Sequence, residues 1–255
     1  MKILMLFFLW QFHHLSGSPA HSSPAIKHKP EVDWFPLDCQ EIWDHGQQAK
    51  GVYTIYPQGA QRPLPVYCDI TTDGKIWTVF QKRLDGSMDF QQSWQGYVNG
   101  FGNADGEYWL GLQNIYLLTM KREYELRVDL KDMSNNTSFA QYGNFSLSRN
   151  ALNPENDGYR LYLGAFTDGE AGDALSDHVG YMFSTYDNDQ DGDVQNCAAY
   201  WGGGFWYHSQ SCGGVGLNGR YKAMKLLQHA FSWFTWVDFP ETLRASQMKM
   251  RRVPN

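Results

Sequence analysis

Alternating apolar and polar side chains predict one well-defined strand. From Tyr124 to Leu130, the sequence YELRVDL has an apolar residue at every second position and charged residues between them. A period of two indicates a half-buried β-strand. Runs of β-branched and aromatic residues predict further strands at 51–57, 65–70, 77–83 (also half-buried), 159–166 and 247–253. A short helix is predicted at 109–118, where leucines follow a turn.

The pattern changes in the second half of the chain. From about Gly169 to about residue 245, loops rich in Gly, Asp, Asn and Ser are interrupted by clusters of aromatic residues. A loop region of this length is typical of functional loops held by cross-links or by a metal ion. We therefore predict an α+β fold with a central antiparallel sheet and a long, loop-rich C-terminal region.

Residues 1–20 have the features of a secretory signal peptide. Lys2 supplies a positive start, the residues after it are mostly apolar, and small residues follow. The apolar run is too short to cross a bilayer, although a membrane-anchored N-terminus is the alternative interpretation. Residues 21–36 are polar and contain prolines, which predicts a short linker, and globular sequence occupies residues 37–253. We expect a secreted, extracellular protein without membrane insertion.

The composition narrows the classes of partner. A net charge of −6 argues against nucleic acid as a partner, because such proteins carry basic patches. Hydrophobic residues make up 42% of the chain and aromatic residues 16%, which is enough to build a substantial core. The chain has neither a heptad pattern nor a collagen repeat. Any homo-oligomer is therefore expected to form through non-covalent contacts between globular surfaces.

The chain has four cysteines, Cys39, Cys68, Cys197 and Cys212. An even number in a secreted chain favours disulfides, and four cysteines allow three connectivities. Pairing of sequence neighbours, Cys39 with Cys68 and Cys197 with Cys212, is the simplest of the three. Zinc binding is the alternative, but the chain has no C-x₂-C pair of the kind that zinc sites use.

Three asparagines lie in N-glycosylation sequons. They are Asn135 (N-N-T), Asn136 (N-T-S) and Asn144 (N-F-S). Because Asn135 and Asn136 are adjacent, we expect only one of them to carry a glycan. Three sequons within one short segment, downstream of a signal peptide, predict an exposed and glycosylated region.

Aspartates alternate with other residues between Asp187 and Asp193. Closely spaced carboxylates are hard oxygen ligands, and they suit Ca²⁺ better than softer metals. The opening of this run fits an EF-hand loop, but the twelfth position, where such a loop requires glutamate, is Ala198. A solvated acidic turn without a metal is the other interpretation.

Many motifs in a fixed order identify a family. The segments GVYTIYP, PVYCDI, WTVFQKR, GEYWLGL, YELRVDL, FSTYDNDQD and LNGRY resemble those of the fibrinogen C-terminal, or fibrinogen-related, domain. The resemblance covers about residues 37–253. It implies an N-terminal subdomain with a disulfide, a central antiparallel sheet, and a C-terminal loop region that holds Ca²⁺ and a ligand pocket.

The resemblance also implies the calcium ligands. By distance from Cys197, the side-chain ligands are Asp189 and Asp191, and the main-chain carbonyls of Asp193 and Gln195 complete the protein's share. Two carboxylates two residues apart converge when the loop between them curls tightly. Ca²⁺ is the only cofactor that we expect.

A ligand pocket beside the second disulfide is a further implication. Related domains that bind acetyl groups use an aromatic residue four positions after the first cysteine of that bridge, which here is Trp201. Their pocket includes the peptide before the second cysteine, which here joins Ser211 to Cys212. Tyr207 and His208, inside the same loop, are additional candidates for ligand contact.

The aromatic residues of this loop have two interpretations. Trp201, Phe205, Trp206 and Tyr207, with His208, form either a sugar-stacking or protein-binding surface or part of the core. For Trp206 and Tyr207 the core is favoured. For Trp201, which precedes three glycines, both interpretations stay open.

The chain departs from the acetyl-binding pattern at several positions. The histidine that follows the second cysteine in relatives is replaced by Gly213, and later tyrosine positions fall on 227–228 and 241–242. The disulfide loop is also longer than in relatives. We expect recognition of acetylated sugars to be weakened or redirected.

These observations predict a non-enzymatic, calcium-binding recognition or adhesion module of the extracellular matrix, with matrix proteins or glycans as partners. The alternative is a ficolin-like lectin of innate immunity that binds acetylated glycans on microbial surfaces. An enzyme is not expected, because the chain has no G-x-S-x-G or H-E-x-x-H motif and no cysteine left over for nucleophilic attack.

Overall fold

The computed structural model describes residues 34–221, 231–237 and 241–254. The chain divides into two units, Met1–Trp34 and Phe35–Asn255. The expected signal peptide and residues 21–33 of the expected linker lie outside the described residues, so both stay predictions. The description below concerns the second unit.

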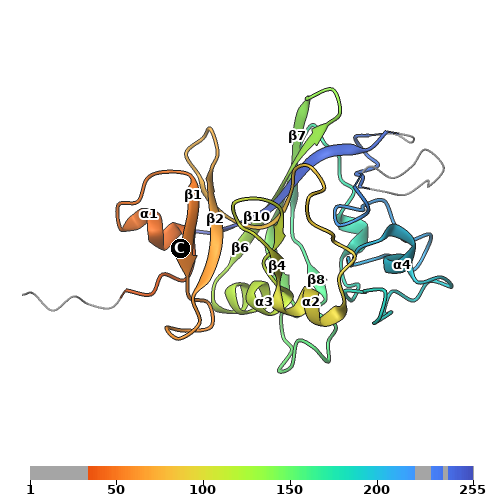
Figure 1. Ribbon diagram of the computed structural model, residues 1–255, viewed down its shortest axis with the longest axis horizontal. Helices are drawn as coiled ribbons and strands as arrows, with labels where there is room; N and C mark the ends of the chain where they lie inside the picture. Colours follow the sequence, from red (N-terminus) through yellow and green to blue (C-terminus); the bar gives the residue numbers. More distant parts are fainter. Residues whose placement is uncertain (1–33, 222–230, 238–240, 255) are drawn as a thin grey trace, which may run out of the picture. The chain divides into compact units, whose positions relative to one another are not determined.

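A mostly sequential antiparallel sheet forms the centre of this unit (Figure 1), as predicted. Its strands follow the order β1-β2-β3-β10-β6-β7-β8, with β9 on β7 and the short β4–β5 pair on β3. The strands are β1 (Gly51–Ile55), β2 (Leu64–Ile70), β3 (Ile76–Arg83), β4 (Phe101–Gly102), β5 (Tyr108–Trp109), β6 (Tyr124–Asp132), β7 (Thr137–Leu147), β8 (Leu161–Tyr162), β9 (Phe166–Gly169) and β10 (Leu243–Arg252). The last strand of the chain therefore lies in the middle of the sheet.

Strand β6 shows why the sheet forms where the sequence alternates. Its burial alternates along the strand, with Leu126 and Val128 in the core and Arg127 and Asp129 on the other face. Val128 pairs with Met248 of β10, which is also buried. Because successive side chains of a strand point to opposite faces, this register places the apolar face of both strands in one core.

Strand β3 differs from its prediction, since it is buried at every position. Two of its polar side chains reach partners in the C-terminal loop region. The Gln81 amide donates to the carbonyl of Leu217 at 2.9 Å, and Arg83 Nη1 donates to the carbonyl of Gly219 at 2.9 Å. The expectation of a half-buried strand was wrong, because loops far away in the sequence cover its second face.

Other elements differ in their bounds. The predicted helix at 109–118 is observed as α3 (Leu112–Lys121), because Gly111 has a φ of +103° immediately before it. The predicted strand at 159–166 is split into β8 and β9. Strand β7, the longest in the sheet, was not predicted, and it pairs with β6 along most of its length.

Short helices complete the unit. Helix α1 (Cys39–Asp44) packs near β3, and α2 (Trp94–Asn99) lies beside α3, which packs on β7 (Figure 1). Helix α4 (Cys197–Trp201) and one turn of 3₁₀ helix (Ser176–His178) are the regular elements of the described part of the loop region between β9 and β10. The predicted loss of regular pattern after Gly169 is confirmed.

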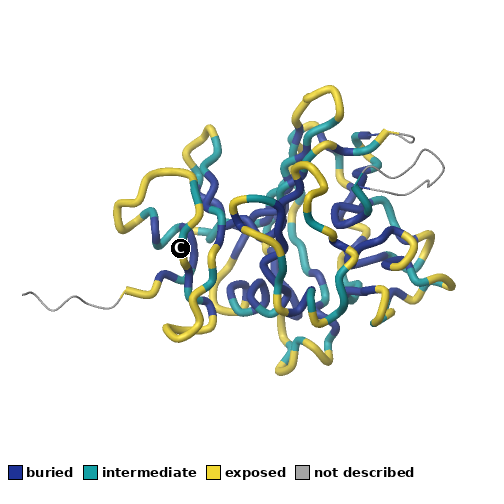
Figure 2. Tube along the Cα trace, viewed as in Figure 1, coloured by how far each residue is buried: buried dark blue, intermediate teal, exposed yellow. Residues whose placement is uncertain are grey.

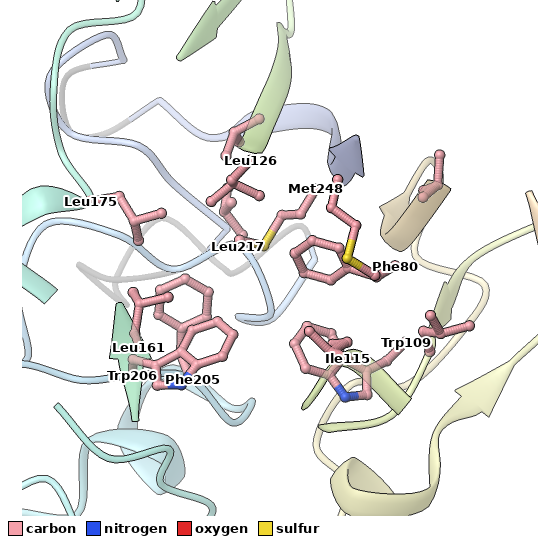
Figure 3. Close-up of a cluster of buried hydrophobic side chains, with 14 of the residues drawn as sticks. Phe80, Trp109, Ile115, Leu126, Leu161, Leu175, Phe205, Trp206, Leu217 and Met248 are labelled. Atoms are coloured by element: carbon pink, nitrogen blue, oxygen red, sulfur yellow. The ribbon is translucent and has the colours of Figure 1, made fainter. Parts of the chain in front are cut away.

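The core is continuous from the sheet into the loop region. Figure 2 shows buried chain both along the central strands and around α4. Figure 3 draws Phe80, Ile115 and Met248 in the same buried cluster as Phe205 and Trp206 of the disulfide loop. The rings of Trp109 and Trp206 are 6.1 Å apart between centroids. The loop region is therefore held by the same apolar core as the sheet.

Both disulfides have the predicted pairing, Cys39–Cys68 and Cys197–Cys212. The first joins α1 to β2, and the second closes the loop that follows the acidic segment. Among the described residues, none of the helices has the length and apolar character needed to cross a bilayer.

Candidate metal site and ligand pocket

The acidic loop runs from Ser184 to the start of helix α4. Ser184 and Phe205 exchange main-chain hydrogen bonds of 2.9 and 3.1 Å, which tie the start of the loop to the chain that follows α4. Gly192 has a φ of +76°, a conformation that favours glycine, and it allows a sharp turn. At the far end, the Asn196 side chain accepts from the main chain of α4 and donates to the carbonyls of two residues near the start of the loop.

Asp191 is at the centre of this loop and is 2% exposed. One carboxylate oxygen accepts from the N–H of Asp193 at 2.9 Å, and the other accepts from the N–H of Cys197 at 3.0 Å. Burial raises the pKa of Asp191, and the adjacent Asp189 carboxylate raises it further, against these two hydrogen bonds. Two neighbouring carboxyl groups such as those of Asp189 and Asp191 repel each other when both are ionised, and a shared proton or a bound cation relieves this repulsion.

The other two expected ligands are placed by the same turn. The carboxylate of Asp193 accepts from the N–H groups of Gln195 (3.2 Å) and Ser211 (3.0 Å). No hydrogen bond from the described residues reaches the main-chain carbonyls of Asp193 and Gln195. Two carboxylates, and two main-chain carbonyls that accept no hydrogen bond from the described residues, thus lie on one loop, and Ca²⁺ binds oxygen donors of this kind.

Soft metals fit this loop less well. The carboxylate of Asp193 lies within 4.8 Å of the sulfur atoms of Cys197 and Cys212, a grouping that resembles a metal site. Both sulfurs belong to a disulfide, however, so neither is the thiolate that zinc binds. The carboxylate and carbonyl oxygens of the loop are therefore its candidate cation donors.

The aromatic residues of the disulfide loop are core residues. Trp201 is 1% exposed, and Phe205, Trp206 and Tyr207 are fully buried. The expected core positions of Trp206 and Tyr207 agree with this burial, and the open question for Trp201 is answered in favour of the core. Of the two interpretations of these aromatic side chains, the burial supports the core and not a recognition surface.

Of the remaining pocket candidates, Cys212 is buried, His208 is half-buried and Ser211 is exposed. The His208 ring packs against Tyr181 at 4.9 Å between centroids. Ser211 and Cys212 both have positive φ, of 57° and 63°. The structure places these residues on one loop that folds back on the acidic turn, through the Ser211 N–H.

Gly213, at the position of the relatives' histidine, lies directly over a buried imidazole. A Cβ atom there would approach His178 Cε1 to 2.4 Å, and the φ of +84° disfavours any side chain. His178 is fully buried, and its Nδ1 lies 2.7 Å from the carbonyl oxygen of Trp206. The imidazole of His178 therefore occupies the space that a side chain at position 213 would need. Residues 227–228 lie outside the described residues.

Three exposed apolar side chains near the acidic loop were missed from the sequence. Tyr186 is 46% exposed, Val194 is 107% exposed, and Tyr200 is 38% exposed. In α4, residues Cys197, Ala198 and Trp201 are buried, which leaves Tyr200 on the outer face. The exposure of Tyr200 follows from helical spacing only if helix α4 is known. The sequence around this short helix has no periodic pattern that would predict it.

The sequon asparagines Asn135, Asn136 and Asn144 are all exposed. Exposure is a requirement for a stable glycan on the folded chain, and it is met at each of the three positions. Their glycosylation stays a prediction.

Comparisons with known proteins agree on one family. The family model for the C-terminal globular domain of fibrinogen beta and gamma chains matches residues 35–253. Microfibril-associated glycoprotein 4 of Bos taurus is 54% identical over 221 residues, covering 86% of each chain, and that of Homo sapiens is 53% identical over 220 residues, also covering 86% of each. The solved fibrinogen-like globe domain of human ANGPTL2 has a TM-score of 0.79 and 38% identity, and the match covers 86% of this chain and 100% of that chain.

Proposed function

This chain belongs to the fibrinogen C-terminal domain family, as its motifs predicted, and from that premise we propose that it is a secreted, calcium-binding glycoprotein of the extracellular matrix. It is an extracellular recognition module of the fibrinogen-like type, and we assign it a non-enzymatic role in adhesion. Its relatives at 53–54% identity are named for association with microfibrils, so we propose a microfibril component as its partner.

The observation that carries this proposal is the position of the exposed apolar side chains. Tyr186 and Tyr200 are linked through Asn196, whose amide donates to the carbonyl of Tyr186 at 3.2 Å and whose carbonyl accepts from the N–H of Tyr200 at 3.1 Å. Val194, on the acidic loop, is exposed as well. Exposed tyrosines are favoured in protein recognition, because they offer apolar area and a hydroxyl group at low entropic cost. We call Tyr186, Val194 and Tyr200 the exposed apolar patch.

Calcium would act on this patch through the loop that carries it. Asp189 and Asp191 would hold the ion with the carbonyls of Asp193 and Gln195, and bound Ca²⁺ would neutralise the carboxylate pair. Val194 lies between the two carbonyl ligands in the sequence. The ion would thus fix the loop in one conformation, and we propose that it supports partner binding without touching the partner.

The lectin alternative has less support. The acetyl-binding pocket of relatives is formed by side chains at the positions of Trp201 and residue 213. In this chain Trp201 is buried, and Gly213 has no room for a Cβ atom. We therefore expect weak or no binding to acetylated sugars.

Replacement of Asp191 tests the calcium site. We expect millimolar Ca²⁺ to raise the melting temperature of the native chain and to leave that of Asp191→Asn unchanged, because the variant loses the buried carboxylate ligand. An Asp44→Asn variant, altered at an exposed acid on α1, should respond as the native chain does. Differential scanning calorimetry with Ca²⁺ and with EDTA measures this, and an equal rise in Asp191→Asn would contradict the assignment.

Retention on purified elastic microfibrils tests the function. We expect calcium-dependent retention that Tyr200→Ala and Tyr186→Ala reduce about tenfold each, the loss typical of one buried interface anchor. Met120→Ala, at an exposed side chain of α3, is the matched control and should bind normally. Binding to an N-acetylglucosamine resin that free sugar competes away, without retention on microfibrils, would instead favour the lectin.

A further inference from the structure

A groove of about 720 Å³ lies along one end of the central sheet. It is bordered by strands β3, β6, β7 and β10 and by residues 168–170, and its volume is within the range of about 300–1,000 Å³ that ligand sites occupy. The side chains at its walls include Arg127, Asp129, Lys131, Phe139, Glu170 and Gln247. The groove is remote in sequence from the acidic loop and from the exposed apolar patch.

The chemistry of the groove suits a neutral ligand rich in hydroxyl groups. Arg127 Nε lies 2.6 Å from Asp129 Oδ1, so neighbouring charges compensate one another. The Phe139 ring is contacted by the Arg127 guanidinium, 3.6 Å from the ring centroid, and lies close to Gly169, where a Cβ atom would be 2.4 Å from the ring. The wall combines apolar surface with hydrogen-bond donors and acceptors, a mixture that suits a sugar, which carries both hydroxyl groups and apolar ring faces.

A turn that contains two of the sequons lies at the end of this groove. Lys131 of β6 pairs with Thr137 of β7, and both residues line the groove. Asn135 and Asn136 follow within the exposed turn at the tip of this hairpin (Figures 1 and 2). With a rise of about 3.3 Å per residue, Asn135 is roughly 7 Å of chain from the groove wall.

The two adjacent asparagines are held differently. The main-chain N–H and the side-chain amide of Asn136 both donate to the carboxylate of Asp132, at 2.8 and 2.7 Å. The side-chain oxygen of Asn135 accepts from Arg244 Nη1 at 2.7 Å, while its amide nitrogen donates to no group within the described residues. An Asn135 glycan would therefore leave the hydrogen bonds of the turn intact.

The hydroxyl residues of the two sequons differ as well. Thr137, which completes the Asn135 sequon, is exposed. Ser138, which completes the Asn136 sequon, is 7% exposed, and its hydroxyl donates to the carbonyl of Gly169 at 2.7 Å. Arg244 adjoins Ala245, which lines the groove, so the contact of Asn135 with Arg244 directs the Asn135 side chain toward β10.

We propose that Asn135, rather than Asn136, carries an N-linked glycan, and that the first sugars of this glycan lie in the groove and cover this end of the sheet. The sugar hydroxyls would exchange hydrogen bonds with Asp129, Lys131 and Gln247. The glycan would thereby close the groove to other ligands. The proposal rests on secretion, which is part of the proposed function, because N-glycans are added in the secretory pathway.

Mass spectrometry of the full secreted chain identifies the modified residue. Enzymatic release of the glycan in heavy-oxygen water converts the carrier asparagine to a labelled aspartate, and we expect this label at Asn135. Thr137→Ala removes only the Asn135 sequon, and Ser138→Ala removes only the Asn136 sequon. We expect loss of the glycan mass in Thr137→Ala and retention in Ser138→Ala. A label at Asn136, or none at either residue, would overturn the proposal.

Hydrogen exchange tests the position of the glycan. The chain is produced with high-mannose glycans, and the intact form is compared with the form trimmed to a single sugar, so that the polypeptide is identical. We expect severalfold faster exchange after trimming at residues 129–131, 137–139 and 245–247. Asn144→Gln, which removes the third sequon, should leave exchange at these amides unchanged.

Two results of that comparison overturn the docking. If exchange at the groove amides is equal in intact and trimmed protein, the glycan extends into solvent. If the change is as large in β1 and β2, it reflects a global effect on stability. Failure of secretion is recognised separately, by absence of the chain from the medium, and it would count against the proposed function instead.

Discussion

His178 illustrates how one buried titratable side chain couples the loop region to pH. It is fully buried, and burial lowers its pKa to about 4, despite the contact with the carbonyl of Trp206 that favours the protonated ring. An unfolded histidine has a pKa of about 6.5. Because the folded pKa is the lower one, the stabilisation is fully present above about pH 6.5 and is lost as the pH falls toward 4.

We predict that His178→Gln flattens the acid limb of the stability curve. The native chain should lose about 3 kcal/mol of unfolding free energy between pH 6.5 and 4 through this one group, and the variant should not. The measurement is denaturant unfolding at a series of pH values. His45→Gln, at an exposed histidine, serves as the control and should follow the native curve. Parallel native and His178→Gln curves would contradict the argument.

At the same scale, the sequence was informative about the clustered carboxylates of the acidic loop and uninformative about the burial of the aromatic residues. The spacing of Asp189 and Asp191 is a local property, and the turn at Gly192 that brings them together is local too. Whether Trp201 faces solvent depends on what packs against it, including Tyr207 and Phe234. Composition does not predict such contacts, because apolar residues are common both in the interior and on the surface of a protein.

The second disulfide acts on the loop that carries the proposed metal ligands. It closes a loop with a sequence separation of 15, and its first cysteine begins α4. The N–H of Cys197 donates to the inner oxygen of Asp191. The bridge therefore holds both the helix and the orientation of the buried carboxylate.

We predict that the double variant Cys197→Ser, Cys212→Ser loses about 3 kcal/mol of stability, since a loop of this length restricts the unfolded chain by that amount. We further expect weaker binding of Ca²⁺, because the N–H that orients Asp191 is no longer fixed. Calcium titration calorimetry measures this. The matched variant Cys39→Ser, Cys68→Ser should lose stability and retain the calcium affinity. Equal calcium affinity in both variants would refute the link.

Elements were predicted well where apolar and polar residues alternate in the sequence, and poorly elsewhere. Strands β6 and β10 alternate and were found from the sequence, whereas β7 was missed. Its burial pattern is broken near Asn144 by a register shift opposite β6, and its sequence holds a glycine and polar residues. Its partner strand, not its own composition, makes it a strand.

The whole unit is joined by a buried ion pair between the sheet and the loops. One carboxylate oxygen of Glu107 accepts from the N–H groups of Leu84, Asp85 and Gly86, and the other from Met88. Burial by itself raises the pKa of Glu107, but these four hydrogen bonds outweigh it and lower the pKa. Arg83, 3.7 Å from Glu107, donates in turn to two carbonyls of the C-terminal loops.

We predict that Glu107→Gln destabilises the chain by about 3 kcal/mol, because it leaves the Arg83 charge buried without its partner. Since the folded pKa of Glu107 is lowered, its contribution is present above about pH 4.3 and is lost as the pH falls further. Asp73→Asn, which breaks an exposed pair with Lys75, should cost less than about 1 kcal/mol. Denaturant unfolding at neutral pH measures the loss of unfolding free energy in both variants. A loss in Glu107→Gln as small as that in Asp73→Asn would contradict the stabilising role of the Arg83–Glu107 pair.

By itself, the sequence determined the properties that depend on neighbouring residues. These are the alternating strands, the disulfide pairing, the carboxylates of the acidic loop, and the order of motifs that identifies the family. Each is encoded by a short spacing, so it can be read before any long-range contact is known.

Only the tertiary structure decided which surfaces are exposed. Strand β3 is buried on both faces because loops more than a hundred residues away cover it, as the contact of Gln81 with Leu217 shows. The same packing buries Trp201, leaves Tyr186 and Tyr200 at the surface, and places His178 beneath Gly213. Burial is a property of contacts between distant segments, and no local pattern of residues carries that information.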